Sequence, residues 1–183
     1  LQCPFCYVLN EWLEEANISH LIRWRGVEQY PGFSSEQDHF SERREELDEE
    51  LNRVRRLAPS IDISPPSVIS NTRRAMAVLE RIGSTEPGRI REARCRLYRA
   101  IWQEGRDISD WATIAEVLSE FSLGEIDDEA PELHRVVENT AEWRQKGEDR
   151  IPMLVSRDGL NQWHGFGLRT DMLGFVETHL NDV

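Results

Sequence analysis

Apolar and polar positions divide the chain into a helical start, a long helical middle and a strand-rich end. Over residues 4–16 apolar side chains recur at the spacing of one helix face, and Asn17 ends this pattern. The stretch HLIRWRGVEQY (residues 20–30) alternates apolar and polar side chains and predicts a strand. The apolar face of the predicted helix at 4–16 includes Cys6, Leu9 and Leu13.

The middle of the chain is predicted to be helical throughout. Segment 41–58 is strongly charged and carries a narrow apolar stripe, typical of a helix with one solvated face. After the paired prolines at 65–66, four more helices are expected; Ser70 or Asn71 caps the first and Ser109 caps the third. The stripe of 41–58 consists of Leu47, Leu51, Val54 and Leu57; the later apolar faces lie within residues 75–82, 90–102, 111–121 and 133–143.

The spacing of apolar residues changes from helical to strand-like near the end of the chain. IPMLVS (151–156) and LNQWHGF (160–166) are predicted strands joined by a turn at RDG, and LRTDMLGFVETHL (168–180) is a closing helix. Strands on both sides of a helical block indicate an α/β fold with an all-helical insertion, which we place at residues 66–147 of one domain spanning 1–183.

Composition narrows the class of protein. The chain has 183 residues, 39% hydrophobic and 31% charged, so it has enough apolar side chains to fold around a core. Its net charge of −12 argues against non-specific binding to nucleic acid or to an anionic membrane. No apolar run approaches the ~18 residues that a membrane-spanning helix needs.

The motif CPFC at the start of the first helix is the strongest chemical signal. Unpaired N–H groups and the helix dipole stabilise a thiolate at this end of a helix. We therefore expect Cys3 to face solvent as an attacking thiol and Cys6, one turn further, to be buried as a resolving thiol. Pro4 suits the first helical position.

Two other interpretations of the cysteine pair stay open. A structural zinc site needs four ligands, whereas Cys95 stands alone mid-helix and the five histidines lack ligand spacing. Two inert buried thiols are less compatible with a cysteine at a helix tip.

The dipeptide Ile151-Pro152 is the second signal. Proline is unusual inside a strand, but a cis peptide bond packed against the cysteine pair would explain it. The alternative is an ordinary trans proline at the first residue of the strand.

Taken together, these motifs resemble the DsbA-like thiol–disulfide oxidoreductases of the thioredoxin superfamily. The resemblance rests on CPFCY running into a helix and on IPMLV followed by a DG turn, a strand and a helix. The middle segments NTRRAMAVLERIG and CRLYRAIWQEGRDISDWATIAEVL are similar to the helical insertion of the cytoplasmic-type branch. The family implies a thioredoxin-like fold, with a first strand expected before residue 1.

The resemblance also implies roles for individual residues. Cys3 would be the nucleophile and Cys6 the resolving thiol, while Pro4 and Phe5 would modulate the Cys3 pKa. The substrate would bind at Pro4, Phe5, Ile151 and Pro152, where Pro152 would be the cis-proline. Ile151 would tune the reduction potential and the choice of partner. No metal or cofactor is expected, the partner would be glutathione or a protein with a thiol or disulfide, and the location would be cytoplasmic.

Two other functions are alternatives to this one. The 2-hydroxychromene-2-carboxylate isomerases and kappa-class glutathione transferases share the inserted architecture but typically have serine in place of the nucleophilic cysteine. The second alternative, a redox-inert chaperone or interaction module, predicts that changing Cys3 to serine leaves function intact.

Overall fold

The computed structural model describes residues 1–32, 40–69, 71–124, 126–147 and 150–180. None of the described helices combines the length and the apolar character that crossing a membrane requires. The helices are α1 (Pro4–Glu15), α2 (Phe40–Leu57), α3 (Arg73–Thr85), α4 (Ile90–Trp102), α5 (Trp111–Val117), α6 (Pro131–Gln145) and α7 (Arg169–Leu180), with short 3-10 turns at Ser19–Leu21 and Pro87–Arg89; the strands are β1 (Met153–Val155) and β2 (Gln162–His164).

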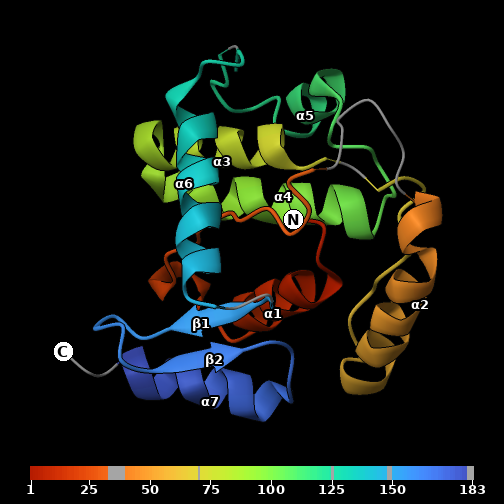
Figure 1. Cartoon of the computed structure of the whole chain (residues 1–183), viewed down its shortest axis with the longest axis vertical. Helices are drawn as coiled ribbons and strands as arrows, with labels where there is room; N and C mark the ends of the chain where they lie inside the picture. Colours follow the sequence, from red (N-terminus) through yellow and green to blue (C-terminus); the bar gives the residue numbers. More distant parts are fainter. Residues whose placement is uncertain (33–39, 70, 125, 148–149, 181–183) are drawn as a thin grey trace.

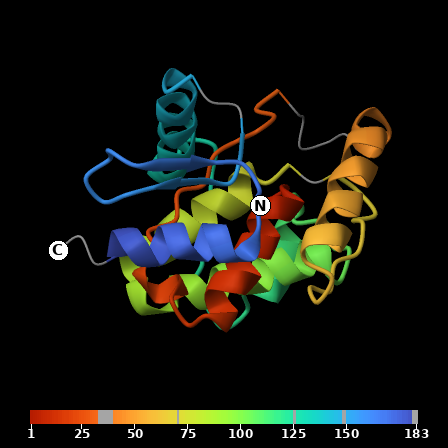
Figure 2. The same ribbon diagram turned by 90° about the horizontal axis from the view of Figure 1, so that it is seen from below.

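Helix α1 lies at the centre of the packing. Figure 1 and Figure 2 show α2, α4 and α7 arranged around it, and each of them contacts it. Because α1 is covered on several sides, its burial is wider than the single face that the sequence predicts. The apolar side chains of α1 that are almost fully buried are Tyr7, Val8, Leu9, Trp12 and Leu13.

The C-terminal hairpin confirms the predicted strands and turn. β1 and β2 are antiparallel, with Met153 opposite His164 and Val155 opposite Gln162. Gly159 has φ +78° in the turn, a conformation that side chains with a Cβ rarely adopt. Figure 2 shows the hairpin beside α7, which brings the start of β1 towards α1.

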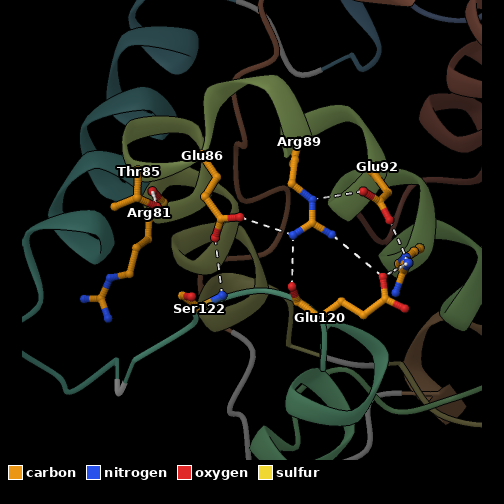
Figure 3. A network of polar contacts seen from close by, with 8 residues as sticks. Arg81, Thr85, Glu86, Arg89, Glu92, Glu120 and Ser122 are labelled. Atoms are coloured by element: carbon orange, nitrogen blue, oxygen red, sulfur yellow. Dashed lines mark hydrogen bonds and ion pairs between the residues drawn. The ribbon is translucent and has the colours of Figure 1, made fainter.

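The helical block α3–α6 is tied together by packing and by a surface network of ion pairs. Arg89 binds the carboxylates of Glu86 at 3.2 Å and Glu92 at 3.3 Å, and it donates to the Glu120 carbonyl at 2.9 Å (Figure 3). The Arg89 guanidinium also lies 3.9 Å above the Phe121 ring. This network joins the turn before α4 to the segment that follows α5.

The predicted helices are confirmed, with changes at two caps. The N-cap of α3 is Thr72, whose side chain makes no capping hydrogen bond. The Asn71 side chain, one residue earlier, accepts the Arg73 N–H at 3.0 Å, and Ser70 lies outside the described residues. Helix α5 is capped by Asp110 and not by Ser109, because the Asp110 carboxylate accepts the Thr113 N–H at 2.9 Å.

The strand predicted for residues 20–30 is wrong. This stretch begins in the 3-10 turn and continues as irregular backbone. A strand needs another strand to satisfy its backbone, and here α6 supplies some of those partners instead. The Glu28 N–H donates to the Thr140 hydroxyl at 3.0 Å, and the Gln29 carbonyl accepts from Arg144 at 3.3 Å.

Candidate active site

The cysteine motif occupies the N-terminus of α1. Cys3 is the N-cap residue, with φ −84° and ψ 120°, and its sulfur accepts the Cys6 N–H at 3.4 Å. Pro4 takes the first helical position, where no N–H is needed. The Cys3 sulfur therefore lies at the positive end of a central helix, where a thiolate is stabilised.

The exposure of the two cysteines is the reverse of the prediction. Cys3 is only 3% exposed, whereas Cys6 is half-buried. Cys3 is covered because the chain returns over it 148 residues later, and its thiol donates to the Ile151 carbonyl with an Sγ–O distance of 3.9 Å. Both residues are free thiols in this structure.

The Ile151-Pro152 segment lies directly before β1. The peptide bond between these residues is cis. Pro152 is buried and Ile151 is half-buried, and the Pro152 carbonyl accepts the Gly165 N–H at 2.9 Å, which holds the segment to the end of β2. The structure thus brings Cys3 and Ile151 together as the sequence analysis expects.

Phe5, the second residue between the cysteines, belongs to a stack of aromatic rings. Its ring centroid lies 4.8 Å from that of Phe166, and Phe166 lies 5.3 Å from Trp12 on the next turns of α1. Arg53 of α2 extends over the Phe5 ring at 5.5 Å and donates to the Phe166 carbonyl at 2.6 Å. Helix α2 and the segment after β2 therefore form one wall of the cysteine motif.

The Cys6 thiol is held in its protonated form. A hydrogen bond with the Cys3 side chain, burial and the charge on Cys3 raise the pKa of Cys6 well above its ordinary value. The Glu50 carboxylate of α2 adds to this effect, which places Glu50 in the electrostatic environment of the pair. The Cys6 thiol therefore keeps its proton at neutral pH.

Glu50 itself is unusual for an acid on a charged helix. Burial raises its pKa to about 7, although the Arg43 guanidinium opposes this and Glu46 adds to it. Its Oε2 atom is buried without a hydrogen-bond partner among the described residues, and Arg43 Nη2 lies 3.6 Å away.

Glu50 and Arg53 are not among the site residues predicted from the sequence, because the charges of segment 41–58 are typical of a solvated helix face. A signal was present for Glu50. It stands three residues after Leu47 and four before Val54, so it falls within the apolar stripe itself.

Cys95 is not part of the site. It is buried on α4, where its sulfur accepts from the Asn10 amide at 3.5 Å, and burial raises the pKa of the Cys95 thiol. The described residues contain no group of three or more His, Cys, Asp or Glu side chains placed to hold a metal ion.

A thiol pair at the tip of a buried helix, facing a cis proline before a hairpin, is an arrangement of the thioredoxin type. The chain belongs to the family of the DSBA-like thioredoxin domain, whose model matches residues 1–155. The protein therefore has a thioredoxin-like fold with a helical insertion, and family membership supports thiol–disulfide oxidoreductase chemistry in general terms.

A solved structure supports the fold. The chain is similar to the crystal structure of "a putative protein disulfide isomerase from Nitrosomonas europaea", with a TM-score of 0.69 and 14% sequence identity. The alignment covers 97% of this chain and 94% of that one. A comparison with curated proteins finds no match.

Proposed function

We propose that the protein is a dithiol–disulfide oxidoreductase that exchanges disulfides with protein or small thiol substrates through Cys3 and Cys6. The observation that carries this proposal is the position of the Cys3 sulfur. It caps α1, accepts the Cys6 N–H at 3.4 Å and lies beside the Ile151 carbonyl at 3.9 Å. A dithiol in this position has a polarised sulfur and a second thiol one helical turn away.

In the reducing direction, the Cys3 thiolate attacks one sulfur of a substrate disulfide. A Cys3–substrate bond forms, the substrate S–S bond breaks, and the other substrate sulfur leaves with the electron pair. Cys6 then loses its proton and attacks Cys3, which forms the Cys3–Cys6 disulfide and releases the second substrate thiolate. The raised pKa of Cys6 keeps this thiol protonated until the mixed disulfide has formed.

In the oxidising direction, the same steps run in reverse. A substrate thiolate attacks Cys3 of the oxidised pair, and Cys6 leaves with the electron pair and takes up a proton. Because a thiol of raised pKa is a poorer leaving group, the raised pKa of Cys6 slows this step. Which direction dominates depends on the reduction potential of the pair.

The proposed substrate-binding residues surround this sulfur. Ile151 and Pro152 form the segment that crosses Cys3, and their backbone would meet an extended substrate. Pro4 and Phe5 lie between the cysteines, and Phe5 is half-buried at the wall formed with Phe166.

The test is equilibration of the purified protein in glutathione redox buffers, with the thiol state read by alkylation and mass. We expect a reversible two-electron transition that disappears in Cys3→Ser. Cys95→Ser is the matched control, because Cys95 lies against Asn10 on another helix, and this variant should retain the transition. The proposal is wrong if Cys3 and Cys6 never form a disulfide across the buffer series.

A further inference from the structure

Arg53 holds a fixed cation beside the cysteine motif. Although Arg53 is an exposed residue, its guanidinium is positioned by two contacts, the Phe166 carbonyl at 2.6 Å and the Phe5 ring at 5.5 Å. Phe5 is the residue directly before Cys6. The charge is therefore placed at the wall of the site and does not depend on a freely moving side chain.

This cation has no carboxylate partner in the part of the chain that the structure describes. The neighbouring Arg43 pairs with Glu46 at 3.1 Å and with Glu50 at 3.6 Å, whereas the hydrogen bond of Arg53 goes to a neutral carbonyl. Glu50, one turn before Arg53, has a pKa of about 7 because it is buried, so it is only partly ionised at neutral pH. The guanidinium keeps donors free for a further acceptor.

An uncompensated arginine is notable in a chain with 34 acidic and 22 basic residues. An acidic protein surface repels anions, so a cation at the site wall changes which substrates can approach. A guanidinium recognises carboxylates by charge and by paired N–H donors.

We propose that Arg53 is a specificity-determining residue that binds a carboxylate of the substrate, so that the site favours thiols and disulfides bearing a carboxylate near the reacting sulfur. This inference rests on the proposed function and narrows its substrate class to anionic thiols. The carboxylate belongs to a small molecule such as glutathione or to an acidic side chain next to a protein cysteine.

The experiment compares rates of reaction of the reduced protein with three small disulfides. They are glutathione disulfide (anionic), 2-hydroxyethyl disulfide (neutral) and cystamine (cationic). In Arg53→Gln, the ratio of the anionic to the neutral rate constant should fall roughly threefold to tenfold, while Arg53→Lys should restore part of it. Added salt should lower the wild-type ratio but have little effect on the variant ratio.

Arg55→Gln is the matched control. It removes the same charge from the same helix, but position 55 points about 200° away from position 53 around the axis, and its guanidinium binds Asn52 at 3.1 Å. The ratio should be unchanged in this variant. A pair of disulfide-linked peptides with glutamate or lysine beside the cysteine then separates the two sources: a preference for the glutamate peptide indicates an acidic protein segment, and a preference confined to glutathione indicates the small molecule.

Three outcomes overturn the inference: an equal loss with all three disulfides in Arg53→Gln, no change in the ratio, or the same change in Arg55→Gln. Failure of the proposed function looks different. In that case, the wild type reacts with none of the disulfides, or Cys3→Ser reacts as fast as the wild type.

Discussion

Replacing Glu50 by glutamine should change how the stability of the protein depends on pH. Glu50 is 15% exposed at its side chain, its Oε2 atom has no hydrogen-bond partner among the described residues, and burial raises its pKa to about 7. The folded protein therefore holds this proton more tightly than the unfolded chain, where the ordinary value of 4.5 applies.

The sign follows from that difference. Because the folded pKa is the higher one, the contribution of Glu50 to stability is present below pH 4.5 and is lost as the pH rises towards about 7. Between pH 5 and pH 8 the free energy of unfolding should fall by at most about 2.5 kcal/mol on this account, and water reaching the carboxylate reduces the value. A neutral glutamine has no such dependence. The free energy of unfolding of Glu50→Gln should therefore rise relative to that of the wild type between pH 5 and pH 8.

The assay is urea denaturation of the reduced proteins at several pH values from 5 to 8. Glu46→Gln is the control on the same helix: burial alone would raise its pKa, but hydrogen bonds from Arg43 and Tyr30 hold the pKa of Glu46 below its ordinary value. Its own contribution is lost only as the pH falls below 4.5, and the Glu46 charge is the last of the causes that shift the pKa of Glu50, so this control should keep most of the wild-type fall. Curves of Glu50→Gln that run parallel to the wild type within about 0.5 kcal/mol would refute the reasoning.

Two further predictions concern stability. Arg94→Met should lower the free energy of unfolding by about 1–3 kcal/mol in denaturant titrations, because Arg94 is 4% exposed at its side chain and its loss removes the N–H that the buried Asn10 Oδ1 atom accepts at 2.9 Å; a loss below about 0.5 kcal/mol contradicts this. Gly167→Ala should lower the melting temperature, since its Cβ would lie 2.6 Å from the Trp163 ring, at a cost of about 1–3 kcal/mol. Gly174→Ala, in open space on α7, should raise stability by about 0.5–1 kcal/mol, and a loss there equal to that of Gly167→Ala would contradict the steric explanation.

The parts of the fold and site that the sequence predicted are those with local signals. The spacing of apolar residues located the helices, the RDG turn located the hairpin, and CPFC and Ile151-Pro152 marked the two segments that meet at Cys3. Each of these signals lies within a few residues of the feature that it predicts.

The errors came from contacts between distant segments. The burial of Cys3 depends on Ile151, which is 148 residues away, so exposure at a helix tip could not be inferred from the helix alone. The expected strand at 20–30 has strand-like alternation, but its backbone is partly satisfied by α6. Arg53 reaches the site only because α2 packs on α1, and the charge pattern of 41–58 does not encode that packing.

The central claim is that Cys3 attacks and Cys6 resolves. The most direct test is incubation of Cys6→Ser and Cys3→Ser with glutathione disulfide, followed by intact mass. Cys6→Ser should accumulate one stable glutathione adduct at Cys3, and the wild type should pass through this adduct to the Cys3–Cys6 disulfide. Cys3→Ser should form little adduct, since burial, a cause of the raised Cys6 pKa that remains in this variant, still favours the protonated thiol. An adduct that forms as readily on Cys6 of Cys3→Ser as on Cys3 of Cys6→Ser would contradict the account.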